Sequence, residues 1–519
     1  MDIGYLIRRG AEWYADHVFL IDGETRFTFA EVNAGANRLA NALLASGCQK
    51  GDRVGILLPN RWEYILSDFG IMKAGMVVVP LNPRLRPKEY GYILKNSEAR
   101  ALIFDAEYAE GVRSTAKDLK SPVEYLCVGD SPAGMASFAE VLAPQSPEEP
   151  AVVIDEKEDL CLMKYTSGTT GKPKGVMLTH RGLRAVATNL LADRLHINAQ
   201  DCLLASGPLT HATGFYVLPF WIKGGRVVIN RRFDIQMMIE TIPKEKVTHL
   251  MLVPTMIRML VDHPDIRKYD LKSLTQINYG ASPISPQLLK EAIEIFGSIF
   301  AQGYGLTEAP VTSTLLNKSD HVVEGTKEEM DRLASIGREL TNVEVKIVDP
   351  AGNECPRGEI GEIALRSDAV MKGYWRLPEE TKLVLKEGWV YTGDIGRMDE
   401  KGYIFLIDRK SDLIISGGFN VYPKEVESVL DSHPKVKESA VIGVPDRKWG
   451  EAIKALVVLK DGCTASEGEL IQYCEDRLAS YKKPKSVEFV ANLPRSSFDK
   501  IDRKILREKY WKGLDRRIA

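Results

Sequence analysis

The sequence predicts an α/β protein with a large N-terminal domain of doubly wound sheets, a small β-rich subdomain and a small α+β domain at the C-terminal end. Before about Ile336, short apolar runs alternate with helical patterns, which is typical of parallel sheets covered on both faces. After Ile336, short strands alternate with turns such as Asp349-Pro350-Ala351-Gly352. A chain of 519 residues is too long for one hydrophobic core, so we expect several domains or subdomains.

The N-terminal elements follow one another in the order that a doubly wound sheet requires. Thr28 and Glu31 have the spacing of a capping box and begin a helix, which Gly47 can end. Residues 131–150 are rich in Pro, Ser and Glu and predict a connecting loop. The other expected strands are 52–58, 76–81, 101–105, 159–165, 247–253 and 274–279, and the other expected helices are 61–73, 87–96 and 181–192.

A loop rich in glycine, hydroxyl side chains and lysine follows the strand at 159–165. Its backbone N–H groups can approach an anion closely, and its hydroxyls and lysines add donors and positive charge, which together suit a polyphosphate. The ordinary P-loop is excluded, because only two residues separate Gly168 from Gly171 and Pro173 follows Lys172. A flexible surface loop is the alternative interpretation of the same composition.

Two later segments offer further chemistry for a nucleotide. In segment 302–308, Tyr304 presents a flat face, Thr307 a hydroxyl for a phosphate, and Glu308 a carboxylate oxygen of the kind that Mg²⁺ binds. Asp394 follows a Thr-Gly turn and could accept hydrogen bonds from ribose hydroxyls. Small residues also follow the strand at 274–279, where a flat ligand could lie against the backbone.

These motifs, in this order along nearly the whole chain, make the sequence similar to the adenylate-forming superfamily of acyl-CoA synthetases, luciferases and peptide-synthetase adenylation domains. The resemblance implies that ATP binds with Mg²⁺ at Glu308, and that His211, Thr307, Glu308 and Lys500 act in catalysis. The nucleotide-binding residues that it implies are Thr166, Ser167, Gly168, Thr169, Thr170, Gly171, Lys174, Gly280, Ala281, Ser282, Tyr304, Gly305, Thr307, Asp394, Arg409 and Lys500.

The resemblance also implies an N-terminal adenylate-forming domain over 1–408, a hinge at 409–412 and a mobile C-terminal domain over 413–519. Ser411 stands where relatives usually carry Asp or Lys as the pivot, although a small residue can still absorb a large backbone change. Asp499 replaces the Gly that normally precedes the catalytic lysine, so the alternative for Lys500 is a surface lysine in a basic tail. The loop expected to face CoA contains Ser416, Gly417 and Gly418.

The resemblance implies an AMP-forming acyl-CoA synthetase, which joins a carboxylic acid to ATP as an acyl-adenylate and then transfers the acyl group to CoA. Four alternatives stay open: an adenylation enzyme that loads a carrier protein, a luciferase-like oxygenase, a ligase for another small thiol, and a nucleotide-binding protein without activity. Because the thiol is a co-substrate, no cysteine of the chain is needed as a nucleophile.

The acid is expected to lie in a mainly apolar pocket. His211 on its own would more often be structural, but the family's Pro-x-x-His-x-x-Gly segment places it beside the carboxylate substrate. Gly303 is expected to leave room beside the adenine motif, and no Arg or Lys is evident to pair with a second carboxylate. A monocarboxylate with an apolar or aromatic acyl group is therefore expected. The predicted wall consists of His211, Thr213, Phe215, Val253, Gly303, Leu306 and Val311.

Composition narrows the class of protein and its partners. The formal net charge of −2 gives no global field that would attract nucleic acid. Seven cysteines without a CxxC pair are typical of reduced thiols in a cytoplasmic protein. There is no signal-peptide pattern and no apolar run near the roughly 20 residues that span a bilayer. The expected partners are a small carboxylic acid, ATP and CoA, and the protein could also form a homodimer.

Overall fold

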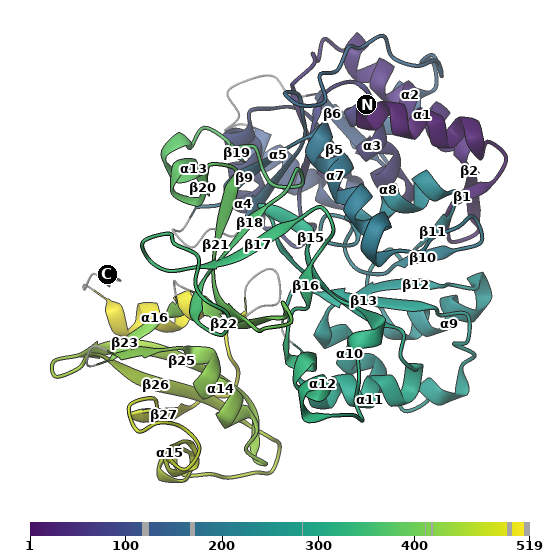
Figure 1. The fold of residues 1–519 in the computed structure, drawn as a ribbon. Coiled ribbons are helices and arrows are strands. Elements are labelled where there is room, and N and C mark those ends of the chain that lie inside the picture. Colours follow the sequence, from purple (N-terminus) through teal and green to yellow (C-terminus); the bar gives the residue numbers. More distant parts are fainter. Residues whose placement is uncertain are drawn as a thin grey trace. The chain divides into compact units, whose positions relative to one another are not determined.

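The computed structural model describes residues 1–116, 124–166, 172–282, 284–409, 412–416, 419–495 and 501–512. The chain divides into two compact units, whose elements are labelled in Figure 1. Unit 1 contains Met1–Val345 and Leu365–Tyr391, and unit 2 contains Lys346–Ala364 and Thr392–Ala519. No helix among the described residues is long and apolar enough to cross a membrane.

The first sheet of unit 1 has a parallel centre and an antiparallel edge. Its strands β8, β4, β3, β5, β6 and β7 run parallel, as the sequence predicts. β9 returns antiparallel to β8, and β19 pairs antiparallel with β9. The order is β19 (Gly373–Tyr374), β9 (Lys174–Thr179), β8 (Leu160–Thr166), β4 (Val77–Pro80), β3 (Arg53–Leu57), β5 (Ala99–Asp105), β6 (Glu124–Val128) and β7 (Ala136–Ser137).

The second sheet repeats this design with nine strands. Strands β14, β13, β12, β10, β11 and β1 run parallel, and antiparallel strands extend the sheet at both ends. The order is β16 (Arg338–Glu339), β15 (Ala309–Leu316), β14 (Phe300–Leu306), β13 (Gln276–Gly280), β12 (His249–Leu252), β10 (Cys202–Ala205), β11 (Arg226–Ile229), β1 (Val18–Asp22) and β2 (Thr25–Thr28).

Helices cover both faces of each sheet, because successive strand residues point to opposite faces. Val54 and Ile56 of β3 enter the central core, whereas Leu57 enters the outer core. The central core also contains α1 (Ile3–Trp13), α2 (Phe29–Ala45), α3 (Trp62–Lys73), α7 (His180–Asn189) and α8 (Gly214–Lys223). The outer helices are α4 (Pro87–Ser97) and α5 (Ala109–Ala116) on the first sheet, and α9 (Ile235–Glu245), α10 (Pro254–Val261) and α11 (Pro286–Phe296) on the second.

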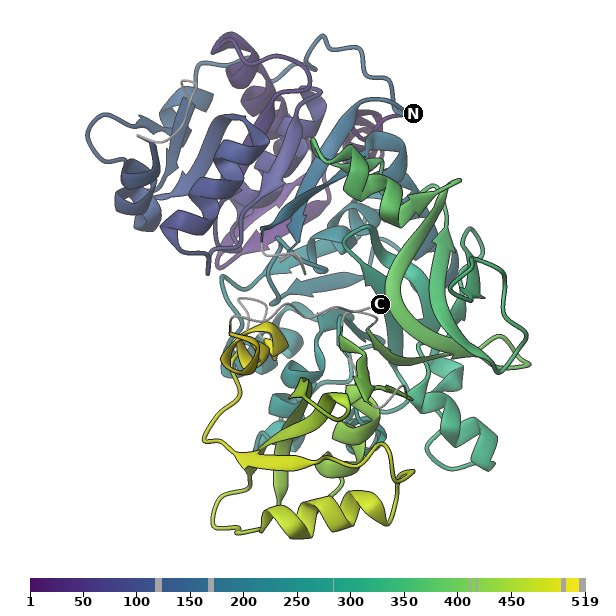
Figure 2. The same ribbon diagram turned by 90° about the vertical axis from the view of Figure 1, so that its left-hand side faces the viewer.

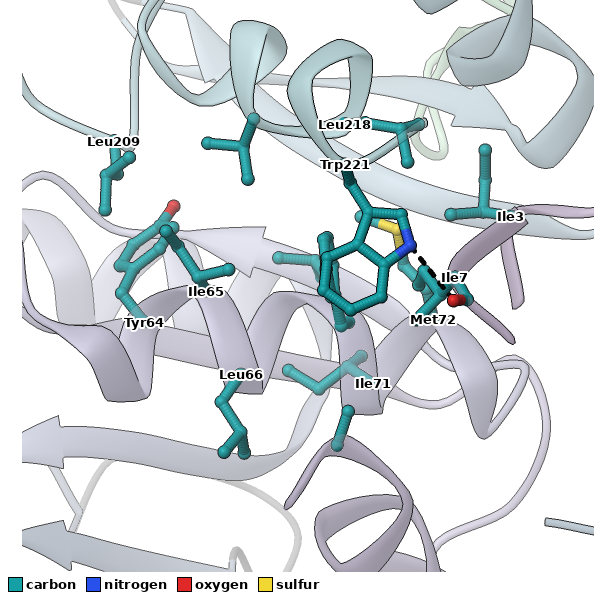
Figure 3. Close-up of a cluster of buried hydrophobic side chains, with 14 of the residues drawn as sticks. Ile3, Ile7, Tyr64, Ile65, Leu66, Ile71, Met72, Leu209, Leu218 and Trp221 are labelled. Carbon is teal, nitrogen blue, oxygen red and sulfur yellow. Dashed lines mark hydrogen bonds between the residues drawn. The ribbon is translucent and has the colours of Figure 1, made fainter. Parts of the chain in front are cut away.

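The helices of the first sheet lie along its purple and blue strands in Figure 2. Trp221 of α8 lies in the centre of the core between the two sheets (Figure 3), and its indole N–H donates to the carbonyl oxygen of Ile7 at 3.0 Å. A Cβ at Gly10 would overlap this indole, so α1 can pack here only with glycine at that position. Helices α1 and α3 therefore pack against α8 in this core.

Two local predictions for unit 1 differ from the structure. The predicted loop at 131–150 contains the short β7 and a helix, α6 (Phe138–Leu142), which Ser137 caps. The predicted helix at 181–192 ends at Asn189 and continues as a π-helical turn, Leu190–Arg194. Such turns are often found at functional sites, and this one carries Arg194.

The third sheet contains β17 (Glu344–Val348), β18 (Ile360–Arg366), β21 (Trp389–Met398), β20 (Leu385–Lys386) and β22 (Ile404–Arg409). The division between the units passes through β17, β18 and β21. The fourth sheet lies wholly in unit 2, and helices pack against it. It contains β24 (Phe419–Val421), β23 (Ile414–Ser416), β26 (Gly450–Leu459), β25 (Val436–Asp446) and β27 (Ser486–Phe489), and the helices of this part are α14 (Pro423–Asp431), α15 (Glu467–Glu475) and α16 (Arg503–Trp511).

Unit 2 is larger than the predicted C-terminal domain, because it also takes in β-strand residues before the predicted hinge. Compactness does not locate a hinge, so the boundaries at 1–408, 409–412 and 413–519 stay a prediction. At the C-terminal end of the predicted hinge, the carboxylate of Asp412 pairs with Arg507 at 2.8 Å and with Arg503 at 3.6 Å.

Candidate active site

The predicted phosphate loop joins two paired strands. Thr166, the last residue of β8, is directly opposite Lys174, the first residue of β9. The hairpin thus holds both ends of the loop close together, so that its N–H groups can face one ligand. Five predicted nucleotide-binding residues lie between these ends and outside the described residues: Ser167, Gly168, Thr169, Thr170 and Gly171.

Glu308 and Lys174 are brought together by a residue that the sequence analysis missed. The hydroxyl of Tyr374 donates to Oε1 of Glu308 at 2.7 Å. The Lys174 ammonium lies 5.1 Å from the centre of the same tyrosine ring. Burial raises the pKa of Tyr374, and the Glu308 carboxylate raises it further, so the hydroxyl keeps the proton that it donates. One tyrosine therefore connects the predicted magnesium ligand with the predicted phosphate-binding lysine.

Strand pairing explains why Tyr374 lies there. Tyr374 pairs with Val176 on β9, which follows directly on the phosphate loop. The backbone N–H of Met371 donates to the carbonyl oxygen of Glu308 at 2.8 Å, and this bond joins the two segments from the other side. Since 66 residues separate Tyr374 from Glu308, no local pattern in the sequence could show the contact.

Glu308 suits Mg²⁺, which usually binds through one or two carboxylates together with substrate phosphates. Its side chain is only half-buried, and the Tyr374 bond holds the carboxylate in one orientation. Among the described residues no group of three or more His, Cys, Asp or Glu forms a metal cage. The donor set is therefore that of a metal shared with a phosphate substrate rather than of a closed protein site.

The predicted adenine side contains tight and strained backbone. A Cβ at Gly280 would overlap the carbonyl oxygen of Gly303 on the neighbouring strand. Ala281 and Val311 have φ of +66° and +46°, and the second value is rare for a β-branched residue. Such strain is often found at ligand sites. Of the other residues predicted here, Tyr304 is buried, and Ser282, Gly305 and Thr307 are half-buried.

The space expected beside Gly303 is occupied, which corrects the sequence prediction. A Cβ at Gly303 would overlap the guanidinium of Arg194. Arg194 is buried, and its Nε donates to Oδ1 of Asn278 at 2.9 Å, while Nη2 donates to the carbonyl oxygens of Tyr279 and Ala301. Burial lowers the pKa of this guanidinium. The π-helical turn thus points Arg194 back to the sheet, where it lies against Gly303, and the expectation that no Arg or Lys pairs with a second carboxylate stays a prediction.

Two residues of the predicted acid pocket, His211 and Phe215, line one internal cavity of about 40 Å³. Nδ1 of His211 lies 2.7 Å from the hydroxyl of Thr210. The Lys164 ammonium lies 4.4 Å from the centre of the Phe215 ring. A lysine therefore lies against one residue of the predicted acid pocket. The lining of this cavity does not include the other predicted wall residues, Thr213, Val253, Gly303, Leu306 and Val311.

In unit 2, Asp394 and Arg409 lie opposite each other on paired strands. Nε of Arg409 is 3.1 Å from Oδ1 of Asp394. The carboxylate is buried, whereas the arginine side chain is 56% exposed, so the pair can still present its guanidinium to a ligand. The hydroxyl of Thr392 accepts from the N–H of Asp394 at 3.0 Å and shapes this turn. Ser416 is buried on β23, and the structure does not describe Ser411, Gly417, Gly418 or Lys500.

Comparison with known proteins identifies the family. Residues 7–375 match the family described as AMP-binding enzyme, and residues 425–500 match the AMP-binding enzyme C-terminal domain. The chain belongs to the AMP-binding enzyme family. This confirms the predicted superfamily.

Relatives of this AMP-binding enzyme match almost its whole length. It is 39% identical to a feruloyl-CoA synthase of Amycolatopsis sp over 94% of this chain and 95% of that protein. It is 35% identical to the fatty acid–[acyl-carrier-protein] ligase ScoC of Streptomyces coeruleorubidus over 96% of this chain and 94% of that protein. The structure of ATP-bound MatB from Rhodopseudomonas palustris superposes with a TM-score of 0.88 at 32% identity, covering 99% and 100% of the two chains.

The cavity of this AMP-binding enzyme contains two ionisable residues that the sequence analysis did not consider. Lys164 lies in the otherwise apolar strand β8, and Asp68 lies on the apolar helix α3. A charged residue inside an apolar pattern is the signal that could have found both, because such residues are seldom buried without a partner.

Proposed function

We propose that this AMP-binding enzyme is an AMP-forming carboxylate–CoA ligase for a monocarboxylic acid with an apolar or aromatic acyl group. The observation that supports it best is the arrangement of Lys174, Tyr374 and Glu308, in which a lysine and an oriented carboxylate flank one tyrosine at the end of a phosphate loop. This arrangement suits a nucleotide triphosphate bound with Mg²⁺.

In the first half-reaction, a carboxylate oxygen of the acid attacks the α-phosphorus of ATP. The new O–P bond forms as the bond to the bridging oxygen breaks, and pyrophosphate leaves with the electron pair. Both reactants are anionic, so catalysis consists of positioning and charge neutralisation. Lys174 and the loop would hold the β and γ phosphates, His211 would lie beside the acid, and Lys500 would bridge the carboxylate and the α-phosphate.

Glu308 would hold Mg²⁺, which supplies positive charge against the phosphates when bound. The bond from Tyr374 keeps the Glu308 carboxylate in place before the nucleotide arrives. Tyr304 would face the adenine, Thr307 a phosphate oxygen, and Asp394 the ribose hydroxyls.

In the second half-reaction, the sulfur of CoA attacks the acyl carbon, and the bond to the AMP oxygen breaks as AMP leaves. We assign the CoA side to the loop with Ser416, Gly417 and Gly418, and the change of domain orientation to the hinge at Ser411. Arg409 would bind the nucleotide in both halves. CoA is preferred over a carrier protein as acceptor because the chain is 39% identical to a feruloyl-CoA synthase, while the likeness to ScoC keeps a separate carrier as the second candidate.

The test is AMP release from ATP and Mg²⁺ with a panel of carboxylic acids, each measured alone, with CoA, and with a phosphopantetheinyl carrier protein. We expect AMP release that requires both an acid and CoA. AMP release that requires the carrier protein would identify the carrier, and not CoA, as the acceptor. The absence of AMP release with every acid would contradict the proposed ligase activity. A cytoplasmic location and a monomer or homodimer are further proposals, for fractionation and light scattering to decide.

Lys500→Ala separates the two halves. We expect this variant to lose acyl-adenylate formation, since no other group would bridge the two anions, and to keep CoA transfer from supplied acyl-adenylate. Equal loss of both half-reactions would contradict the role of Lys500. Lys504→Ala, a change at a nearby exposed lysine, is the matched control.

A further inference from the structure

Three polar side chains face the cavity of unit 1 without a hydrogen bond or an ion pair to a described residue. Tyr64 and Asp68 come from α3, and Lys164 comes from β8. Within the part of the chain that the structure describes, none of the three has a hydrogen bond or an ion pair with another residue. The cavity, at about 40 Å³, exceeds the ~10–15 Å³ that one water molecule needs.

The rest of the cavity lining is mainly apolar, and several of its residues are visible in Figure 3. Tyr64 is 4% exposed, so its hydroxyl meets only the cavity and the surrounding core. Asp68 and Lys164 keep some accessible surface because they face the cavity, although protein surrounds them. The labelled residues that line the cavity are Ile3, Tyr64, Met72, Leu209 and Leu218.

Burial acts on both ionisable groups in the cavity. It raises the pKa of Asp68 to about 7 and lowers the pKa of Lys164 to about 8, while the attraction between the two opposes each shift. Buried charges that are not directly paired destabilise a fold, and a stable core would normally carry apolar residues here. Groups held in this way mark a functional site more often than a structural one.

The cavity shares two lining residues with the predicted acid pocket. His211, which we place beside the carboxylate of the acid, forms part of its wall. Phe215, four residues later, lines the cavity and carries the Lys164 ammonium on its ring. Lys164 itself lies two residues before Thr166, where the phosphate loop begins. An acyl group that extends inward from His211 would therefore meet Lys164 and Asp68 at its far end.

We propose that this cavity receives the end of the acyl group remote from the carboxylate and selects acids that carry a hydroxyl there. A hydroxyl can accept a hydrogen bond from the Lys164 ammonium and donate one to the Asp68 carboxylate at the same time. A second carboxylate would face Asp68, and an ammonium would face Lys164, so neither charged group suits both partners. The inference rests on the proposed ligase function, because it assigns the far end of that same substrate.

The competing explanation is that the cavity holds ordered water alone and plays no part in binding. In that case the enzyme would not distinguish an acid with a terminal hydroxyl from its analogue without one. A site built to hydrogen-bond a hydroxyl rejects the analogue, because its buried polar groups are then left unpaired.

The experiment measures kcat/KM for AMP release with CoA, using two matched pairs of acids. One pair is cinnamic acid and 4-hydroxycinnamic acid, and the other is octanoic acid and 8-hydroxyoctanoic acid. We expect the wild type to prefer the hydroxylated member of at least one pair by about tenfold or more. Equal kcat/KM within both pairs would overturn the inference while leaving the ligase intact. The absence of AMP release with every acid of the wider panel would overturn both.

Variants then assign the preference to these residues. At nearly unchanged side-chain volume, Lys164→Met removes the ammonium donor and Asp68→Asn replaces the charged acceptor with a weaker, neutral one. Lys223→Met at the exposed end of α8 is the control. We expect the hydroxyl preference to fall about tenfold in each cavity variant and to stay unchanged in the control. Should one variant fold poorly, the double variant Lys164→Met/Asp68→Asn, which leaves no unpaired charge, provides the same comparison. A preference that survives in folded variants would overturn the assignment.

Discussion

Two regions of unit 1 each combine a lysine, a tyrosine and a carboxylate, and they differ in how these groups are held. At the phosphate loop, Tyr374 donates to Glu308 at 2.7 Å and carries Lys174 on its ring. In the cavity, Tyr64, Asp68 and Lys164 have no hydrogen bond to one another or to other described residues. We call these the loop triad and the cavity triad.

The difference follows from what each triad is built to meet. The loop triad is open to solvent on one side, so its charges stay hydrated while strand pairing orients them for a highly charged nucleotide. The cavity triad lies in a mainly apolar lining, where burial shifts the pKa of Asp68 and of Lys164, so a ligand that forms hydrogen bonds with them would offset part of the cost of desolvation. The first arrangement favours catalysis by preorganisation, and the second favours selection among substrates.

The largest effect is expected at the loop triad. Glu308→Gln removes the charge that would hold Mg²⁺ against the phosphates while keeping the side chain's shape. We expect acyl-adenylate formation to fall by about 1000-fold, the size seen when one electrostatic partner of a transition state is removed. Pyrophosphate exchange measured across a Mg²⁺ titration checks it. Wild-type activity of Glu308→Gln at the Mg²⁺ concentration that saturates the wild type would show that Glu308 is not the metal ligand.

Tyr374→Phe is expected to act more weakly, because it removes only the orientation of Glu308. Loss of such a supporting hydrogen bond typically costs about 10–100-fold in metal affinity or activity. We expect a higher Mg²⁺ requirement with a smaller change in kcat at saturating metal. The matched control is Tyr165→Phe, whose hydroxyl bonds Asn96 at 2.7 Å instead. Equal effects in the two variants would contradict the special role of Tyr374.

Residue patterns and motifs were enough to predict most of the fold from the sequence. The alternation of apolar runs and helices predicted both parallel sheets, and the family is confirmed. The capping box of Thr28 and Glu31 is present as predicted. The antiparallel strands at the sheet edges were not foreseen, because β9 and β19 are as apolar as their parallel neighbours and the direction of pairing leaves no mark in composition.

Site residues could be predicted from the sequence only where they lie in a motif whose residue types and whose position along the chain both indicate a nucleotide site. Tyr374 was not predicted because strand pairing brings it to Glu308, although the two residues are far apart in the sequence. Arg194 was not predicted because a π-helical turn points its side chain into the space over Gly303. Lys164 is the one charged residue of β8 and Asp68 is one of three in α3, and a periodicity averaged over a whole element hides such individual residues. The roles of the phosphate-loop residues 167–171 and of Lys500 stay predictions.

The cavity triad is expected to reduce stability, which sharpens the contrast with the loop triad. Replacing a buried, imperfectly paired ion pair with neutral or apolar side chains is often stabilising by about 1–4 kcal/mol. We therefore expect Lys164→Met/Asp68→Asn to raise the free energy of unfolding at pH 7.5, measured by urea denaturation. Glu308→Gln, at a half-exposed position, should change it little. A less stable double variant would identify the pair as structural.

The smallest and most specific effect is the pH dependence of that gain. The pKa of Asp68 is raised by burial to about 7, so the folded state binds its proton more tightly than the unfolded state does. Stability of the wild type should therefore fall as pH rises from about 4 to 7. The pKa of Lys164 is lowered to about 8, so stability should recover above pH 8 as the folded state releases that proton first. Tyr64 and His211 also face the cavity, but they are unchanged in the double variant and cancel in the difference.

The stability gained by the double variant should thus be largest between pH 7 and 8, where both groups are charged in the folded wild type. Urea denaturation of both proteins at pH 5, 7.5 and 9.5 measures it. We expect the gain to shrink by about 2 kcal/mol at each outer value, because Asp68 is protonated in the folded wild type at pH 5 and Lys164 has lost its proton there at pH 9.5. A stability gain that does not vary with pH would mean that it comes from better packing in the double variant and not from the removal of buried charge. A saturating hydroxylated acid should reduce the difference in the free energy of unfolding between the two proteins at pH 7.5, because it forms hydrogen bonds with Lys164 and Asp68 in the wild type.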